Sequence, residues 1–160
     1  MKEVKIECTL YVFDSLEKTP EDVRNLMHHA IKARLNAYAP YSKFNVGAAI
    51  LLDNGEIVTG SNQENASYPS GLCAERTAIY YAGAQYPDSK MMSMAITASS
   101  QNNPTNSPIP PCGACRQAIS EYEVKQEAPI EIYFMGETGK VAKSNSLANL
   151  LPLVFDKRVL

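Results

Sequence analysis

The 160-residue chain carries 15 basic and 17 acidic residues, for a formal net charge of -2. It has no basic stripe that could bind a phosphate backbone, and no apolar run approaches the roughly 20 residues that span a bilayer. These properties argue against a nucleic-acid or membrane partner and favour a small-molecule ligand. A chain of this length is expected to form one domain, residues 1–160, that buries roughly two-thirds of the unfolded surface.

The first 18 residues predict a strand extension. Residues 3–13 alternate apolar and polar side chains, which is the period of a half-buried strand. Cys8 falls on the apolar side and is expected to be a small buried hydrophobe. Nothing here resembles a secretory signal, so the cysteines are expected to be reduced in a cytoplasmic compartment and free to bind metal.

A helix is predicted next, followed by a hairpin. Thr19 and Pro20 supply an N-cap and a first helical residue, and an apolar stripe continues at helical spacing to Leu35. Residues 44–52 and 56–61 predict the hairpin, because the intervening Asp-Asn-Gly suits a tight turn.

The second half of the chain alternates helices with strands. Expected helices cover residues 74–85, 113 to about 122 and 146–151, and expected strands cover 91–98, about 130–134 and 141–143. Residues 62–72 and 101–111 are polar or proline-rich and are expected to be loops, the second fully exposed. This order predicts an α/β fold with three layers, in which helices cover both faces of a mixed central sheet.

Two cysteine stretches are the strongest chemical signal. Cys112 and Cys115 lie one helical turn apart, and folding could bring Cys73 to the same point. Three sulfurs would leave the fourth position of a zinc ion open, and Glu75 could take a proton from water there. Cys73 and Glu75 can share that site only if Cys73 caps the helix, since residues two apart on a helix face opposite sides.

Other interpretations of the cysteines stay open. A lone C-x-x-C is often a structural zinc half-site or a redox pair, and Cys8 is the available fourth sulfur that would close the site. Three thiolates give the complex a charge of -1, which Arg76 or Arg116 could offset by hydrogen bonding to sulfur; Arg76 is the better placed.

Together with their neighbours, these stretches resemble a known family. Cys-Ala-Glu-Arg-Thr-Ala at 73–78 and Pro-Cys-Gly-Ala-Cys-Arg-Gln at 111–117 are similar to the homotetrameric zinc-dependent cytidine deaminases of pyrimidine salvage. Further similar motifs are Ala-Pro-Tyr-Ser-Lys-Phe at 39–44, Val-Gly-Ala-Ala at 46–49 and Gly-Ser-Asn-Gln-Glu-Asn-Ala-Ser-Tyr at 60–68. The resemblance spans roughly residues 20 to 155. It implies a cytidine deaminase-like fold, one zinc ion per chain, and hydrolysis of cytidine and deoxycytidine to the uridine compounds and ammonia.

The resemblance also implies roles for single residues. Glu75 would carry protons between water, the pyrimidine ring and the departing amine, which requires a raised pKa. Phe44 would pack on the pyrimidine, Asn62 and Glu64 would hold the ribose hydroxyls, and the main chain at Ala66 would meet the base. Phe155 would cover the site of a neighbouring subunit.

The chain departs from the family pattern at the N-terminal strand, at Gln63 and in the tail at 156–160. The strand bears on the subunit interface or a sheet edge, and the tail bears on the lid formed by Phe155. Separately from these departures, the alternatives are a deaminase acting on another cytosine nucleoside, such as a blasticidin-type antibiotic, and a zinc-stabilised binding module without turnover. RNA or DNA editing is a third alternative, which the charge balance disfavours.

Overall fold

A computed structural model describes residues 1–160 as one mixed six-stranded sheet with three long helices. The strand order is β1-β6-β5-β4-β2-β3, and every neighbouring pair is antiparallel except β4 with β5. The strands are β1 (Tyr11–Phe13), β2 (Phe44–Leu52), β3 (Ile57–Ser61), β4 (Met91–Ser100), β5 (Glu131–Met135) and β6 (Val141–Ser144).

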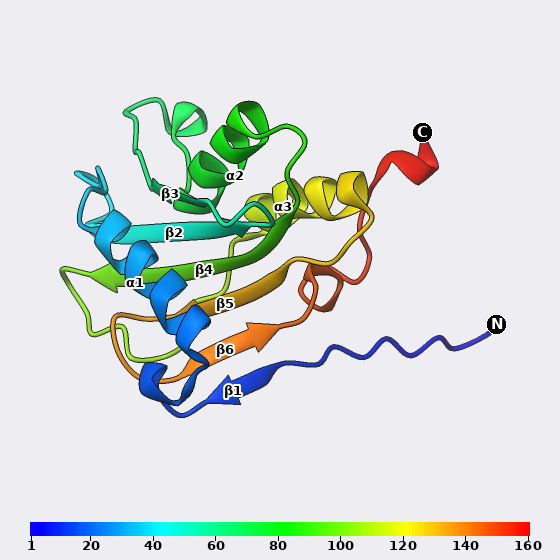
Figure 1. The fold of residues 1–160 in the computed structure, drawn as a ribbon, viewed down its shortest axis with the longest axis horizontal. Helices are drawn as coiled ribbons and strands as arrows, with labels where there is room; N and C mark the ends of the chain where they lie inside the picture. Colours follow the sequence, from blue (N-terminus) through cyan, green and yellow to red (C-terminus); the bar gives the residue numbers. More distant parts are fainter.

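The helices form two outer layers. They are α1 (Glu21–Arg34), α2 (Ala74–Gln85) and α3 (Gly113–Gln126), and α1 crosses one face of the sheet while α2 and α3 lie behind the other (Figure 1). Two separate apolar cores follow from this arrangement. One joins α1 to residues such as Ala49 and Tyr133, and the other joins α2 and α3 to residues such as Ile50 and Ile132. The expected three-layer α/β fold is confirmed.

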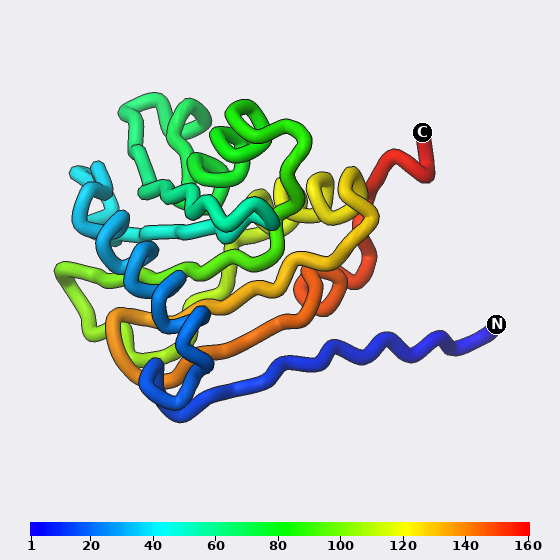
Figure 2. Tube along the Cα trace, in the orientation of Figure 1, coloured from blue at the N-terminus to red at the C-terminus, as the bar shows by residue number.

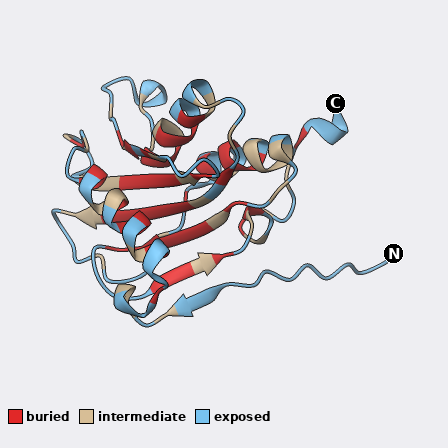
Figure 3. Ribbon diagram, in the orientation of Figure 1, coloured by how far each residue is buried: buried red, intermediate tan, exposed pale blue.

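The central strands are the most buried part of the molecule (Figure 3). Ala48, Ala49 and Ile50 of β2 are each fully buried, because helices cover both faces of that strand. Two glycines permit the close helix packing. A Cβ at Gly47 would lie 2.1 Å from the Ala30 carbonyl oxygen of α1, and one at Gly60 would lie 2.6 Å from the Ala74 carbonyl oxygen of α2.

The parallel β4–β5 pair determines where the site forms. Parallel strands need a crossover connection, and α3 supplies it here. The start of α3 is thereby brought beside the start of α2, on the same face of the sheet (Figure 1).

Several predicted boundaries are corrected. The N-terminal strand pairs with β6 only over Tyr11–Phe13, and residues 1–10 have no regular secondary structure. Cys8 is exposed rather than buried. Helix α1 begins at Glu21 with Pro20 as its N-cap residue, and Thr19 donates instead to the Leu16 carbonyl.

Two further expectations are wrong in part. Leu35 lies just after α1 and is 74% exposed, so it is no member of the apolar stripe. The last helical segment is a single 3-10 turn, Leu147–Asn149. No helix of the structure combines the length and apolar character required to cross a membrane.

Candidate active site

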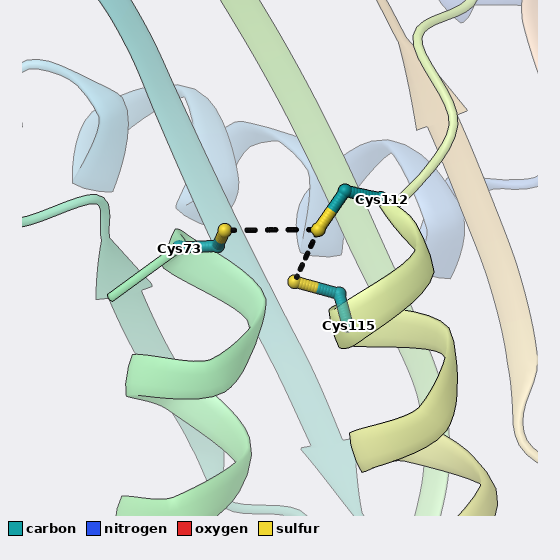
Figure 4. Close-up of side chains that lie close together, drawn as sticks. All are labelled: Cys73, Cys112 and Cys115. Atoms are coloured by element: carbon teal, nitrogen blue, oxygen red, sulfur yellow. Dashed lines mark hydrogen bonds between the residues drawn. The ribbon is translucent and has the colours of Figure 1, made fainter. Parts of the chain in front are cut away.

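Three cysteine sulfurs converge between the starts of α2 and α3 (Figure 4). Cys73 Sγ lies 3.8 Å from Cys112 Sγ, which lies 3.5 Å from Cys115 Sγ, and all three sulfurs are within 4.8 Å of one another. A tetrahedral zinc ion with Zn–S distances of about 2.3 Å would separate its sulfurs by about 3.8 Å. The donor set therefore fits zinc in both chemistry and spacing.

Both helix starts favour thiolates. Cys73 is the N-cap residue of α2 and Cys112 is the N-cap residue of α3, and neither side chain makes a capping hydrogen bond. Their sulfurs are thus free for a metal, and the unpaired N–H groups of two helix ends favour negative charge there. The cluster contains no fourth sulfur, because Cys8 lies outside it.

Glu75 lies beside the sulfurs and is 4% exposed. It shares the site with Cys73 because Cys73 precedes the helix, as the geometry required. Burial, reinforced by the charge of Cys73, raises the pKa of Glu75 to about 7. A carboxyl group with a pKa near neutrality can both accept and donate a proton, as expected for a general acid and base.

Arg76 contacts sulfur and Arg116 does not. The Arg76 guanidinium donates to Cys73 Sγ at 3.6 Å, and its buried Nε has no hydrogen-bond partner. Hydrogen bonds from Cys115 and Arg76 lower the pKa of Cys73 to about 5. Arg116 instead donates to the Pro111 and Leu150 carbonyls, so the alternative role for Arg116 at sulfur is wrong.

A cleft of about 710 Å³ opens onto the metal cluster. Phe44 and Val46 of β2 and Ile96 and Ala98 of β4 contribute apolar surface to it. The predicted residues that line this cleft are Phe44, Asn62, Glu64, Cys73, Glu75, Arg76 and Cys112. Its size and mixed lining suit a small, flat, partly polar ligand.

Asn62 has a structural role that the sequence did not reveal. Its amide oxygen accepts from Val46 N at 2.8 Å and its amide nitrogen donates to the Phe44 carbonyl at 2.9 Å. Asn62 thus fixes the backbone on both sides of Asn45, where β2 enters the cleft. One lone pair and one N–H of the amide remain for a ligand.

Glu64 lines the cleft and is bound to the backbone just before β2. One carboxylate oxygen accepts from Tyr41 N at 2.9 Å and from Ser42 N at 3.3 Å. Hydrogen bonds from Ser42 and from the two backbone amides lower the pKa of Glu64, so the group is ionised at neutral pH. Its second oxygen is available to a hydroxyl group in the cleft.

Two predicted ligand residues lie outside the cleft of this chain. Ala66 is exposed in the loop that leads to Cys73, and Phe155 is 62% exposed, with its carbonyl accepting from Gln117 Nε2 at 2.7 Å. Cys115, fully buried, lies behind the lining rather than on it.

Some lining residues were missed from the sequence. One of them is Tyr41, which forms a tilted aromatic pair with Tyr68 at a ring-centroid distance of 6.0 Å. Ile109 and Pro110 line the wall beside Cys112, so the loop at 101–111 is not wholly exposed. Two features of the sequence could have indicated these lining residues. Tyr41 lies within the motif at 39–44, and Ile109 lies three residues before the metal ligand Cys112.

The fold and the site together define an α/β protein with a three-sulfur metal site and an adjacent buried acid. A family model described as the cytidine and deoxycytidylate deaminase zinc-binding region matches residues 20–128. The chain belongs to this family, and its cofactor is zinc, for which Cys73, Cys112 and Cys115 could supply the ligands.

Relatives and solved structures agree with this assignment. The chain is 40% identical to a cytidine deaminase of Halalkalibacterium halodurans, over 84% of this chain and 94% of the relative. It is also 40% identical to a cytidine deaminase of Sporosarcina psychrophila, over 85% and 93%. The crystal structure of the Burkholderia pseudomallei cytidine deaminase superposes with a TM-score of 0.70 at 37% identity, covering 82% of this chain and 97% of that one.

Proposed function

We propose that this chain is a zinc-dependent hydrolase that converts cytidine and deoxycytidine to uridine and deoxyuridine with release of ammonia. The observation that carries the proposal is the buried Glu75 beside three clustered sulfurs, at one end of a cleft with apolar walls. Relatives at 40% identity that are named cytidine deaminases support the same reaction.

The proposed chemistry replaces an amino group by an oxygen atom. Zinc, when bound by Cys73, Cys112 and Cys115, supplies a Lewis acid at the point of attack. Glu75 takes one proton from the attacking water, whose oxygen bonds to carbon 4 of the pyrimidine, and gives that proton to the ring nitrogen. It then takes the remaining proton from the new hydroxyl group on carbon 4, which becomes a carbonyl, and gives it to the amine. The carbon–nitrogen bond then breaks, ammonia leaves, and the carboxylate is regenerated.

The cleft residues would orient the nucleoside. Phe44 presents an aromatic side chain to the flat base, and the free oxygen of Glu64 can accept from a ribose hydroxyl while Asn62 uses its remaining N–H. The main chain at Ala66 would meet the base, although Ala66 itself lies outside the cleft lining of this chain. Arg76 would offset the negative charge of the thiolates.

The cleft favours a nucleoside over a nucleotide. Arg76 is the one cationic side chain that lines it, and this guanidinium already donates to Cys73. A ligand phosphate would therefore have no free cation, and Glu64 would repel it.

The wider setting is proposed on the same basis. We infer action in pyrimidine salvage in the cytoplasm, supported by four free cysteines. We also infer one domain over residues 1–160, one zinc per chain, no nucleic-acid or membrane partner, and a homotetramer in which Phe155 covers a neighbouring site.

Replacing Glu75 tests the mechanism. Glu75→Gln keeps the shape of the side chain but cannot shuttle protons, so turnover of cytidine should fall by about 10²–10⁴-fold. Zinc content should stay at one ion per chain. Turnover is followed by the loss of cytidine absorbance, and undiminished turnover in the variant would remove Glu75 from the mechanism.

A substrate panel separates the alternatives. Ammonia release is measured with cytidine, deoxycytidine and a blasticidin-type nucleoside at equal concentrations. Preference for the antibiotic would replace the proposed substrate. Full zinc occupancy without turnover of any of the three would indicate a binding module.

A further inference from the structure

The first ten residues form an extended segment, here called the N-terminal arm, that projects away from the body (Figures 1 and 2). One hydrogen bond, from Thr9 N to Asn149 Oδ1 at 3.3 Å, ties it to the body. All ten residues are exposed (Figure 3). The arm also lies outside the family match, which begins at residue 20.

The arm has the two faces of a strand but lacks a strand's partners. Val4, Ile6 and Leu10 fall on one face and are 73%, 49% and 45% exposed. Lys5 and Glu7 fall on the other, as their 2.6 Å ion pair shows. Such alternation is typical of a strand with one face buried, yet nothing in this chain covers the apolar face.

The arm continues β1, the strand at one edge of the sheet. Strand β1 pairs with β6 on one side and has no strand on the other, so its outer edge presents unpaired N–H and C=O groups. A long exposed edge with apolar side chains is a template for pairing with another chain. In natural proteins, exposed strand edges of this kind are usually covered. The sequence of the arm indicates which partner could cover the free edge of β1 and of the arm.

We propose that the arms of two copies of this chain pair as antiparallel strands about a two-fold axis at Ile6. Lys5 then lies opposite Glu7 of the partner subunit, and Glu7 lies opposite the partner's Lys5. The two opposite-charge pairs stabilise the pairing, since directly opposed charges interact across strands. On the other face, Val4 lies opposite Cys8 of the partner subunit, so these apolar side chains lie side by side, and Lys2 lies opposite the partner's Leu10.

Other registers are less favourable. A register that keeps apolar side chains on one face must be centred on a residue, because a one-residue slip moves every side chain to the other face. Centring on Lys5 or on Glu7 places like charges directly opposite. Centring on Val4 places Glu7 opposite Met1 and so leaves it without an opposite charge, and centring on Cys8 leaves both Lys5 and Glu7 without opposite charges. Only the Ile6 centre pairs the full arm and both charges.

The geometry leaves room for both bodies. A ten-residue strand extends about 33 Å. In antiparallel pairing the two bodies lie at opposite ends of the paired arms, so they do not compete for space. The partner is a second copy because an arm with this charge pattern is complementary to itself.

Engineered disulfides test the register. In Val4→Cys, residue 4 lies opposite Cys8 of the partner subunit, at a Cα separation of about 4.5–5.5 Å that a disulfide can bridge. Under mild oxidation at micromolar concentration, the variant should form covalent dimers, read on a non-reducing gel. Glu3→Cys is the matched control, because residue 3 lies on the other face and opposite Thr9. It should form dimers at least tenfold more slowly, and Val4→Cys with Cys8→Ala should form none.

Exchanging charges tests the pairing independently. Lys5→Glu and Glu7→Lys each place like charges opposite one another, so in each variant alone the association through the arms should weaken at least tenfold in sedimentation, whereas the homotetramer proposed above should persist. Mixing the two variants should restore association, because every opposed pair then has opposite signs although neither chain has its own internal ion pair. Zinc content, measured on each variant, verifies folding.

Defined outcomes would overturn the proposal. Equal cross-linking of Val4→Cys and Glu3→Cys, or covalent dimers of the native chain through Cys8 at the same rate, would exclude the register. Unchanged sedimentation of the two charge variants and of their mixture would exclude the arm pairing. None of these measurements depends on turnover, so the proposed function stands or falls separately.

Discussion

At the scale of single residues, sulfur position is the most consequential feature. Cys115 is fully buried within the cluster, whereas Cys8 is exposed and apart from it. Cys115→Ser should reduce zinc content well below one ion per chain, because a hydroxyl is a poor substitute for a thiolate ligand. Elemental analysis checks this, with Cys8→Ser as the matched control that should retain its zinc. Loss of zinc in the control would bring Cys8 into the site.

Asn62 holds β2 in place, apart from its proposed role toward the ligand. Asn62→Ala would leave Val46 N–H and the Phe44 carbonyl without their partners, and should destabilise the fold by about 2 kcal/mol. Asn45→Ala is the control, since Asn45 lies in β2 and its side chain makes no hydrogen bond. Chemical denaturation of both variants measures the difference. Equal stabilities would show that the Asn62 bonds contribute nothing net.

Sequence reasoning located the chemical residues better than their surroundings. Cys73, Glu75 and the C-x-x-C pair could be predicted, because metal ligation restricts residue type and spacing. The hydrogen bonds of Asn62 to β2 could not, because they join residues 16 and 18 positions apart across the β2–β3 hairpin. The contact of Arg116 with Leu150 was missed for the same reason.

At the scale of elements, helix α2 depends on how closely it approaches β3. A Cβ on Gly60 would meet Ala74 O and Ala78 N, both at 2.6 Å, and these are backbone atoms that cannot rotate away. Gly60→Ala should therefore destabilise the protein by about 1–3 kcal/mol and reduce turnover, since α2 carries Cys73 and Glu75.

The control for that change lies at the start of α3. A Cβ at Gly113 would meet nothing within 4 Å, so Gly113→Ala should stabilise the protein by about 0.4–1 kcal/mol. Thermal unfolding of the two variants should thus shift in opposite directions. If Gly60→Ala leaves the free energy of unfolding unchanged, then α2 can shift away from β3 without destabilising the protein.

Element boundaries were predicted well where local chemistry defines them. The bounds of β2 and α2 agree with expectation, because a tight turn ends one and a capping position begins the other. The N-terminal strand was predicted too long, over residues 3–13 instead of Tyr11–Phe13. Alternating apolar residues indicate that one face of a segment can be buried, but they do not identify the partner that buries it. The last predicted helix, residues 146–151, is only a 3-10 turn at Leu147–Asn149, because so short a segment gains little free energy from helix formation.

At the scale of the whole molecule, the metal site joins two helices that otherwise meet only by packing. Removing zinc with a chelator should lower the unfolding temperature by about 5–10 °C, taking free zinc at about 100-fold above its dissociation constant. Calorimetry with and without chelator measures the shift. Cys115→Ser should show no response to the chelator, and a native chain that is equally unresponsive would contradict a bridging ion.

The route between Cys73 and Cys112 has a consequence for biosynthesis. The chain between them includes β4, the strand that pairs with both β2 and β5. Cys112 and Cys115, the second and third sulfur ligands, can join Cys73 only after the ribosome has released enough chain for β4 to pair with β2. Zinc acquisition should therefore follow the pairing of β4 with β2, and its kinetics during refolding would report on that pairing.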